Sequence, residues 1–356
     1  MSRQDSKKHP VIELILDRAR SGSQPLRRDD GFKLGLAIEG GSMRGVVSAG
    51  MVTALEYLQL LNVFDSVYGS SAGAFNGAFF VARQAAYGTT IYYENINNKA
   101  FISFRRFLSR EPIVKIEYLV ENILIKEKVL DWKAVLDSRI PLNVVVSSLN
   151  ELGAKVLNSF ETKDELLIAL HASSKMPLIA GSPVELAGDR FLDASVFEAI
   201  PFPAACKDDC THVLVLLTRP RGQLKEPNFL DRLYVARKLD KLTVGLGQCY
   251  LNSNRVYNET ISAIRDGESN PREQPYVLPI SLPEGHTTLR KTEKNERRLV
   301  DAAMAGMKAV FSAINGESSQ LTKVLTPFDK FGHICRPPWV ASSPEVPNQK
   351  PKEVSL

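Results

Sequence analysis

The side chain best suited to covalent chemistry is Ser71, the central serine of a GSSAG pentapeptide that runs from Gly69 to Gly73. In the pattern GxSxG, the serine occupies a strained turn between a strand and a helix, and its small neighbours let the two elements approach. An apolar run at residues 63–68 precedes the motif and a helical run at residues 72–86 follows it. We therefore interpret Ser71 as a nucleophile. The alternative is a glycine-rich turn whose serine caps a helix.

A serine hydroxyl attacks an ester efficiently only when nearby donors stabilise the oxyanion that forms. The loop GGSMRG, which starts at Gly40 after an apolar run at residues 34–38, offers such donors. Gly40, Gly41 and Ser42 are small, so their backbone N–H groups can face a cleft beside the positive end of the helix expected at residues 45–61. This loop is the candidate oxyanion hole.

The same loop does not match the nucleotide-binding loops that it superficially resembles. Val46 stands where the pattern GxxxxGK[ST] needs lysine, and Ser42 stands where GxGxxG needs its second glycine. Arg44, inside the loop, has two interpretations: it is a structural side chain, or it attracts an anionic head group.

Asp193 is the candidate base for Ser71. It ends a short segment of strand character and is followed by the small residues Ala194 and Ser195. An aspartate in such a position can also simply cap a turn. Because an unperturbed aspartate has a pKa of about 4, catalysis would require burial beside Ser71 to raise its basicity.

The elements that must position these residues alternate in type. From residue 34 to residue 86 the order is strand, loop, helix, strand, turn and helix, which is the pattern of a parallel α/β sheet. A helical stretch at residues 90–138, broken near Pro112, would cover the site. Further strands are expected at residues 142–148, 155–160, 183–193, 212–218 and 276–280, and further helices at residues 165–173, 228–266 and 292–314. The fold class is therefore α/β.

The composition changes along the chain and suggests four segments. Residues 10–20 have the spacing of an amphipathic helix, and residues 21–31 form a polar linker. Prolines are frequent beyond residue 325, which predicts an irregular or disordered tail. We expect an N-terminal helix and linker at residues 1–32, a core at 33–220, an α/β extension packed on that core at 221–325, and a proline-rich tail at 326–356.

The length, net charge and cysteine content of the chain narrow the class of protein. The chain has 356 residues and a net charge of +5, which does not argue for a nucleic-acid binder. Its four cysteines are too sparse for a disulfide framework, and Cys206 and Cys210 lack the second Cys or His pair that a zinc site needs. The charged N-terminus has no apolar signal-peptide region, and no apolar run is long enough to span a membrane. We expect a cytoplasmic protein without a metal or another cofactor.

Taken together, the three motif segments resemble the patatin-like phospholipase family. The pattern of that family is a GGGxRG loop, then a GxSxG motif, then a DG[GA] segment far downstream that a proline soon follows. Here Ser71 lies 31 residues after Gly40, Asp193 lies 122 residues after Ser71, and Pro201 follows. The stretch ASSKMP at residues 172–177 looks like the small-residue segment that the family has ahead of its aspartate. The resemblance covers roughly residues 33–220.

This resemblance implies a three-layer α/β/α sandwich with a mostly parallel central sheet, and a Ser–Asp dyad without histidine. By position, Ser71 would be the nucleophile and Asp193 the base of a phospholipase A or lysophospholipase-like lipid esterase. The N–H groups of Gly40, Gly41 and Ser42 would bind the oxyanion. An acyl-enzyme would form and water would then hydrolyse it, with no requirement for calcium.

Two positions depart from the family pattern. Ser42 replaces the third glycine of the loop, and Ala194-Ser195 replaces the residues Gly-[Gly/Ala] after the aspartate. A serine at a position that needs positive φ is strained, so the first departure bears on the oxyanion hole. The second bears on how Asp193 is presented to the nucleophile.

Two other functions remain open from the sequence. An α/β-hydrolase with a Ser–His–Asp triad would take its histidine from His212, His286 or His333, but its nucleophile strand normally comes later in the sheet. The other alternative is a non-catalytic lipid-binding or regulatory protein on the same scaffold. The expected partner is a lipid or phospholipid, and the oligomeric state is not readable from the sequence.

Side chains outside the motifs raise the question of peripheral membrane contact. Phe101, Phe104 and Phe107 are either lipid contacts or ordinary core aromatics. Several basic residues either attract an anionic membrane surface or form solvated helix faces. They are Arg105, Arg106, Arg110, Arg290, Lys291, Lys294, Arg297 and Arg298.

Overall fold

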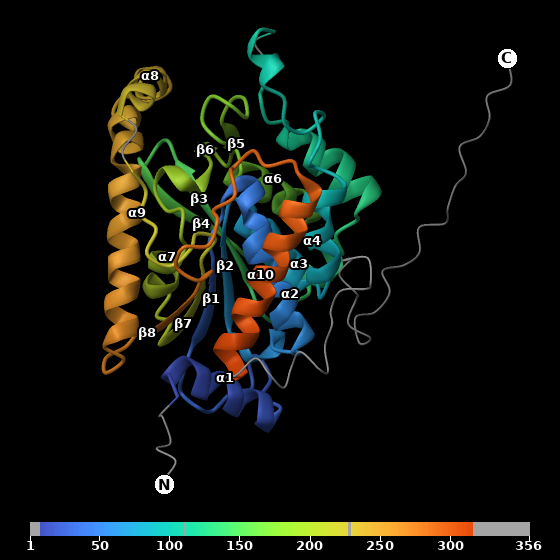
Figure 1. Cartoon of the computed structure of the whole chain (residues 1–356), viewed down its shortest axis with the longest axis vertical. Helices are drawn as coiled ribbons and strands as arrows, with labels where there is room; N and C mark the ends of the chain where they lie inside the picture. The colour runs from blue at the N-terminus through green and yellow to red at the C-terminus, as the bar shows by residue number, and fades with distance from the viewer. Residues whose placement is uncertain (1–7, 110, 227–228, 316–356) are drawn as a thin grey trace, which may run out of the picture.

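The computed structural model describes residues 8–109, 111–226 and 229–315, which fold around one central sheet (Figure 1). Its strands are β1 (Leu34–Ile38), β2 (Ser66–Ser70), β3 (Leu142–Ser148), β4 (Gly153–Leu157), β5 (Val184–Leu186), β6 (Asp189–Leu192), β7 (His212–Leu216) and β8 (Tyr276–Ile280). They lie in the order β5-β6-β3-β2-β1-β7-β8, and β4 also pairs with β3. The run from β3 to β8 is parallel, whereas β4 and β6 pair antiparallel with β3. The predicted α/β class with a mostly parallel sheet is confirmed.

Helices cover both faces of this sheet. They are α1 (Pro10–Ser21), α2 (Val46–Tyr57), α3 (Ala72–Val81), α4 (Ala85–Glu94), α5 (Trp132–Leu136), α6 (Lys163–Ser173), α7 (Phe202–Lys207), α8 (Phe229–Leu239), α9 (Leu246–Ser269) and α10 (Glu296–Asn315). In a strand, successive side chains point to opposite faces, so a strand that is apolar throughout is buried on both sides. On β1, Leu36 and Ile38 pack in the core that contains α2, α3 and α10, whereas Ala37 packs in the core that contains α7 and α9. The result is a three-layer α/β/α arrangement.

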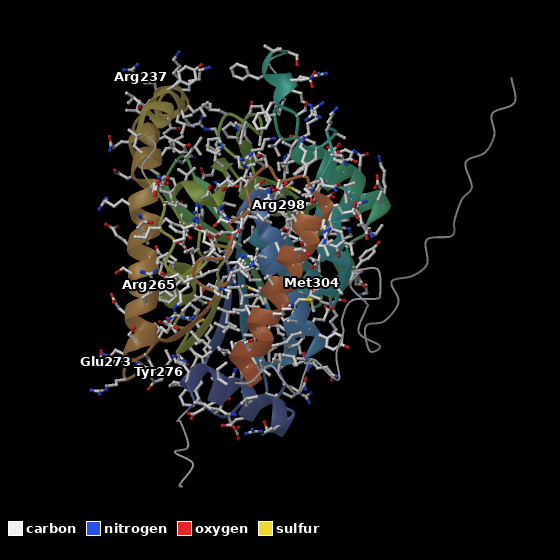
Figure 2. The ribbon with its side chains drawn as sticks, in the orientation of Figure 1. Arg237, Arg265, Glu273, Tyr276, Arg298 and Met304 are labelled. Atoms are coloured by element: carbon white, nitrogen blue, oxygen red, sulfur yellow. The ribbon has the colours of Figure 1, made fainter. Side chains whose placement is uncertain are left out.

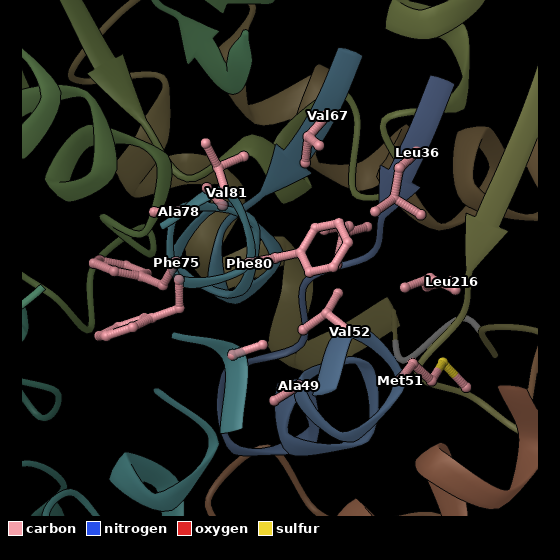
Figure 3. Close-up of a cluster of buried hydrophobic side chains, with 14 of the residues drawn as sticks. Leu36, Ala49, Met51, Val52, Val67, Phe75, Ala78, Phe80, Val81 and Leu216 are labelled. Atoms are coloured by element: carbon pink, nitrogen blue, oxygen red, sulfur yellow. The ribbon is translucent and has the colours of Figure 1, made fainter. Parts of the chain in front are cut away.

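The larger of the two cores lies beside β1 and β2. Figure 3 shows Leu36 and Val67 from these strands facing Phe80 of α3 and Met51 of α2. In Figure 2, Met304 lies along α10 on this side of the molecule, and Arg265 lies along α9 on the other. Thus β8 and α10, which come from the predicted extension at residues 221–325, complete the sheet and one helical layer.

Several predicted helices are shorter than expected, for local reasons. The predicted helix at residues 72–86 divides into α3 and α4, because Arg83 adopts a left-handed conformation with φ of 57°. The predicted helix at residues 228–266 divides into α8 and α9 at Gly245, which has φ of 89°. The side chain of Asp240 accepts the N–H groups of Gly245 and Gly247 at 3.2 and 2.8 Å and fixes this turn. Both breaks use a positive φ, which a helix cannot accommodate.

The predicted helical stretch at residues 90–138 is confirmed only in part: it is broken around Pro112 and lines the pocket beside Ser71, but it contains several short helical segments instead of long helices. After α4 ends at Glu94, the chain forms only a short 3-10 helix at Phe104–Phe107, a π-helical segment at Tyr118–Glu127 and α5. The predicted tail at residues 326–356 lies outside the described residues. Within the part of the chain that the structure describes, no helix is both long enough and apolar enough to cross a bilayer.

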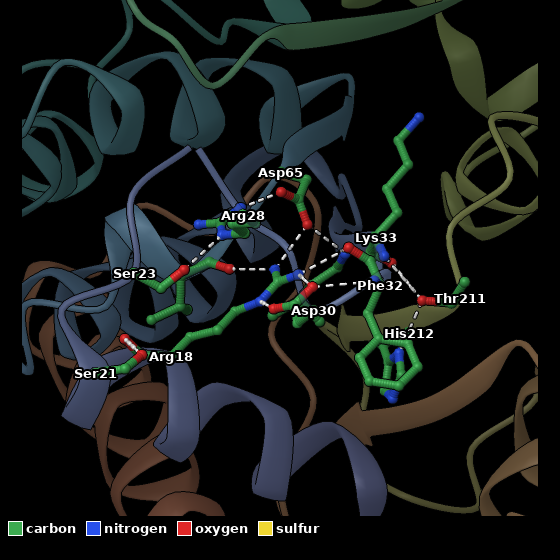
Figure 4. A network of polar contacts seen from close by, with 12 residues as sticks. Arg18, Ser21, Ser23, Arg28, Asp30, Phe32, Lys33, Asp65, Thr211 and His212 are labelled. Atoms are coloured by element: carbon green, nitrogen blue, oxygen red, sulfur yellow. Dashed lines mark hydrogen bonds and ion pairs between the residues drawn. The ribbon is translucent and has the colours of Figure 1, made fainter. Parts of the chain in front are cut away.

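Helix α1 is fixed to the amino ends of the strands by a buried arginine (Figure 4). Arg18 pairs with Asp30 at 2.8 Å and with Asp65 at 2.7 Å. It also donates to the carbonyl groups of Val63 and Phe32, each at 2.8 Å. Because Asp65 in turn accepts the N–H of Leu34, which begins β1, the N-terminal helix is tied directly to the sheet.

Candidate active site

Ser71 lies in the tight turn between the carboxyl end of β2 and the start of α3. Its φ of 55° and ψ of −124° are strained values for a residue with a side chain, as the nucleophile turn requires. Glycines allow the crowding around it. A Cβ on Gly40 would lie 2.3 Å from the carbonyl oxygen of Ser70, and one on Gly73 would lie 2.2 Å from that of Ile38. The glycine-rich loop and the serine turn are therefore packed backbone against backbone.

Two serine side chains hold this turn in place. The backbone N–H of Ser71 donates to Oγ of Ser173 at 2.8 Å, and the Ser173 hydroxyl donates to the carbonyl oxygen of Val145 on β3 at 2.6 Å. The hydroxyl of Ser70 donates to the carbonyl oxygen of Glu198 at 2.9 Å. Sequence reasoning noted the stretch at residues 172–177 but missed this positioning role of Ser173, because only the folded chain places it beside Ser71.

The structure brings Ser71 and Asp193 into direct contact. The Ser71 hydroxyl donates to Oδ2 of Asp193 at 2.7 Å, while Oδ1 accepts the N–H of Ser195 at 2.8 Å. The backbone of Asp193 is anchored as well, by its N–H to the carbonyl oxygen of Lys175 and by its own carbonyl oxygen to the hydroxyl of Ser147. Ser71 is 7% exposed and Asp193 is 1% exposed. A buried carboxylate is therefore in hydrogen-bond contact with the Ser71 hydroxyl, in position to accept its proton.

The loop of Gly40, Gly41 and Ser42 lines the same cleft as Ser71 and Asp193. Within the described residues, the N–H groups of these three loop positions donate to no acceptor, so they are free for an incoming oxygen. Ser42 has a φ of 53°, the left-handed region that the sequence analysis identified as unfavourable for serine. The backbone is thus strained at two residues that line the cleft, Ser42 and Ser71.

An apolar pocket of about 550 Å³ opens on one side of Ser71. Phe75, Phe79, Phe101 and Leu119 are among the side chains that line it. Of the three phenylalanines that the sequence analysis singled out, Phe101 is buried here, while Phe104 and Phe107 are 63% and 69% exposed and lie outside this pocket. The pocket has the character that a hydrocarbon chain requires.

A second, polar cleft of about 360 Å³ also borders Ser71 and shares Ser42 and Met176 with the apolar pocket. Three basic side chains line it together with Ser71 and Asp193, and we call it the cationic cleft: they are Arg44, Lys225 and Lys291. Glu39 lies in the same cleft, where its carboxylate accepts the N–H of Thr218 at 2.6 Å and the hydroxyl of Tyr257 at 3.1 Å. Arg44 is buried, Lys225 is half-buried and the side chain of Lys291 is exposed at the mouth of the cleft. Desolvation by the surrounding protein lowers the pKa of all three basic groups, and that of Lys225 well below the usual 10.5.

The sequence analysis anticipated this cleft only in part. It grouped Lys291 with residues of a membrane-facing or solvated surface, whereas the structure places it in the cleft with Ser71. The backbone explains the position, because the carbonyl oxygen of Lys291 accepts the N–H of Met43 in the glycine-rich loop at 3.3 Å. Lys225 carried no signal in the sequence and was missed.

The described histidines lie away from the serine. His212 begins β7, at the opposite end of the sheet, and packs between the rings of Phe32 and Tyr276 at 4.9 and 5.0 Å. Burial lowers its pKa to about 4. His171 contacts Lys175 and Glu117, and His286 is exposed. Among the described residues, no histidine hydrogen-bonds to Ser71 or Asp193, and His333 lies outside them.

Residues suited to metals do not gather near the site. No group of three or more His, Cys, Asp or Glu side chains within the described part of the chain has an arrangement that could hold a metal ion. Cys206, Cys210 and Cys249 are free thiols, and Cys335 lies outside the described residues.

Comparison with known proteins found similarities to a solved structure, a curated protein and a family model. A crystal structure of VipD from Legionella pneumophila aligns with a TM-score of 0.40 and 12% sequence identity, over 80% of this chain and 67% of that chain. The uncharacterized protein YjjU of Escherichia coli (strain K12) is 27% identical over 203 residues, and the match spans 56% of this chain and 56% of that relative. The chain thus matches only about half the length of its curated relative. Residues 36–206 match the family model for patatin-like phospholipases, which identifies this part of the chain as a patatin-like phospholipase domain.

Proposed function

We propose that this protein is a serine acyl hydrolase that cleaves lipid esters, with Ser71 as nucleophile and Asp193 as general base. The patatin-like phospholipase domain at residues 36–206 supports the class of reaction. The single observation that carries the assignment of roles is the 2.7 Å hydrogen bond between Ser71 and Asp193, two buried side chains that lie 122 residues apart. A buried serine–carboxylate contact at a strained strand-to-helix turn is what covalent acyl transfer needs.

The reaction would proceed in two steps. As Oγ of Ser71 attacks the ester carbonyl carbon, Asp193 takes the hydroxyl proton, and the free N–H groups of Gly40, Gly41 and Ser42 stabilise the oxyanion. Asp193 then returns the proton to the departing alcohol, which leaves an acyl-enzyme on Ser71. In the second step Asp193 deprotonates a water molecule, which attacks the acyl carbon, releases the fatty acid and regenerates the serine hydroxyl.

The surroundings of the serine support a lipid as substrate. Ser71 and Met176 line both the apolar pocket and the cationic cleft, so an ester at Ser71 can place its acyl chain on the apolar side. The departure at Ala194 leaves the carboxylate well placed, because Ser195 N–H still holds its second oxygen at 2.8 Å. The triad alternative lacks a described histidine at the site, and the non-catalytic alternative leaves the free N–H groups of the loop without a role.

Labelling with a fluorophosphonate, which modifies activated serines, tests this function. We expect the wild-type protein to label and to release fatty acid from lipid esters. Ser71→Ala should abolish both, and Asp193→Asn should reduce turnover at least about 10³-fold. Asp189→Asn is the matched control, since it removes another buried carboxylate of β6, one that is bonded to Ser148 rather than to Ser71. A folded wild-type protein that neither labels nor releases fatty acid would rule the function out.

We also infer that the end of the molecule opposite α1 makes peripheral contact with membranes. There the 3-10 helix at Phe104–Phe107 projects beyond the sheet (Figure 1), and Phe104, Phe107 and Leu108 are 63%, 69% and 87% exposed. Exposed aromatic and aliphatic side chains next to basic ones favour a membrane surface. Replacing both phenylalanines with serine should reduce co-sedimentation with lipid vesicles. Leu26→Ser, which removes an equally exposed apolar side chain, should leave co-sedimentation intact.

A further inference from the structure

The cationic cleft holds more positive charge than the protein itself neutralises. Among the described residues, none of Arg44, Lys225 and Lys291 forms an ion pair with a carboxylate. Two nearby cations at the surface do form ion pairs with carboxylates: Arg221 pairs with Glu268 at 2.7 Å, and Arg298 pairs with Glu293 at 2.9 Å. The three cations of the cleft therefore differ from these two neighbours in lacking a paired carboxylate.

The two carboxylates that line the cleft, Glu39 and Asp193, are both occupied by uncharged donors: Asp193 accepts from Ser71 and Ser195. The two oxygens of Glu39 accept the N–H of Thr218 and the hydroxyl of Tyr257. Arg44 donates only its Nε, to the hydroxyl oxygen of Thr218 at 3.3 Å, and the ammonium groups of Lys225 and Lys291 have no hydrogen-bond acceptor among the described residues. Lys225 lies over the ring of Tyr257, at 3.9 Å from its centroid. Several N–H donors are therefore left for a ligand.

The backbone keeps these cations close to Ser71. The N–H and carbonyl groups of Lys225 bond to the side chain of Asn258 on α9 at 2.9 and 3.0 Å, and the carbonyl group of Lys291 bonds to the glycine-rich loop. Desolvation and mutual repulsion lower the pKa of both lysines, and Arg44 and Arg219 add to that repulsion. Holding these cations close together lowers the free energy of unfolding. An anionic ligand that pairs with them would raise it again.

We propose that the cationic cleft binds the phosphate of a lipid headgroup that carries no positive charge of its own, such as the phosphate monoester of phosphatidate. This inference rests on the proposed function, because it places the scissile ester at Ser71 between the two pockets. The acyl chain lies in the apolar pocket and the phosphate accepts hydrogen bonds from Arg44, Lys225 and Lys291. A choline headgroup would bring a further cation into the cleft, and a neutral acylglycerol would leave the three cations without a partner.

Equilibrium binding to the Ser71→Ala protein, which cannot turn over substrate, tests the subsite apart from catalysis. Dihexanoyl phosphatidate below its micelle concentration should bind at least about tenfold more tightly than dihexanoyl phosphatidylcholine or dihexanoylglycerol in titration calorimetry. In the same background, Lys225→Gln with Lys291→Gln should weaken phosphatidate binding about 100-fold, and Lys291→Gln alone about tenfold. The matched control is Arg221→Gln with Arg298→Gln, which removes two paired cations outside the cleft.

The remaining outcomes separate the alternatives. Equal affinity for the three lipids, or equal losses in the cleft and control variants, would overturn the headgroup subsite. Inorganic phosphate that binds as tightly as phosphatidate would show a site for a free anion instead, and would overturn it as well. Fluorophosphonate labelling of the wild-type protein decides the proposed function separately, so labelling without headgroup discrimination would leave the hydrolase standing and remove only this inference.

Discussion

The two ends of the central sheet carry similar side chains in opposite states. At the amino end, Arg18 and Arg28 face Asp30 and Asp65, and the guanidinium groups pair with both carboxylates (Figure 4). At the carboxyl end, the cations of the cleft lie beside Ser71 with no paired carboxylate among the described residues. The charged side chains at the amino end are therefore paired with one another, whereas the cations at the carboxyl end have no paired carboxylate among the described residues.

This difference separates a structural role from a functional one. Buried charges are tolerated when each has a partner and its hydrogen bonds are satisfied, which is the case around Arg18. Buried charges without partners lower stability, and proteins retain such groups chiefly where a ligand uses them. The comparison therefore predicts that substitutions at the two ends shift stability in opposite directions.

The largest effect is expected from Arg18→Met. It leaves Asp30 without a cation and Asp65 with Arg28 as its only cation, so the free energy of unfolding should fall by about 3–5 kcal/mol. Urea denaturation measures the loss. Arg20→Met, which removes a neighbouring arginine whose side chain is 70% exposed, should change stability by less than about 0.5 kcal/mol. Equal losses in the two variants would contradict a structural role for the amino-end network.

Glu198, whose carbonyl group holds Ser70, is a buried acid without a cation in contact among the described residues. Burial raises the pKa of its carboxyl group from 4.5 to about 7. Because the folded chain holds this proton more tightly, wild-type stability should fall as pH rises from 4.5 through about 7.

Replacing Glu198 with a side chain that cannot ionise removes the free-energy cost of burying its charged carboxylate at high pH. Glu198→Gln should leave the free energy of unfolding unchanged at about pH 4 and raise it by about 3 kcal/mol at about pH 9. Asp65→Asn, at the paired end, should instead lower stability at both neutral and alkaline pH. A pH-independent effect of Glu198→Gln would contradict the pKa assignment.

Lys225→Met should stabilise the protein at neutral pH by about 1 kcal/mol, because it removes a half-buried ammonium group that has no paired carboxylate among the described residues. The unfolded chain holds the Lys225 proton more tightly than the folded one, so wild-type stability rises with pH between the lowered pKa and 10.5. The advantage of the variant should therefore shrink as pH approaches 10.5. Thermal unfolding across this range provides the measurement, and a destabilised variant would show that Lys225 has a structural partner after all.

The smallest effect is expected from Ser42→Gly, which relieves a φ of 53° in the loop. Glycine tolerates this conformation but costs entropy, so the net gain should be about 0.5 kcal/mol. Leu26→Gly, at φ of 64° near the amino end, is the control for backbone relief alone. Both should stabilise, but only Ser42→Gly should alter the rate of fluorophosphonate labelling. Unchanged labelling would place Ser42 outside the oxyanion hole.

The sequence predicted those parts of the site that local patterns encode. The apolar run at residues 34–38 became β1, and the turn around Ser71 has the strained backbone that GxSxG implies. The strand predicted at residues 63–68 is offset from the observed β2, which is Ser66–Ser70. The offset arises because the register of β2 is set by its pairing with β1 and β3. The positions of both motifs were therefore readable without the fold.

The cationic cleft was not readable in this way. Lys225 lies in an irregular segment, and Lys291 lies in the connection between β8 and α10, where neither hydropathy nor spacing marks it. Their proximity to Ser71 arises only when β7 and β8 extend the sheet and α10 packs on α2. Long-range packing of this kind leaves no short-range signal in a single sequence.

The pairing of β1 with β7 has a consequence for work with fragments. The family match ends at residue 206, before β7 begins at His212. A fragment cut at that point would contain Ser71 and Asp193 but would turn β1, whose five residues are all buried, into an open apolar edge. Such an edge recruits strands from other chains. We expect this fragment to aggregate when expressed, whereas a fragment ending after α10 should remain monodisperse.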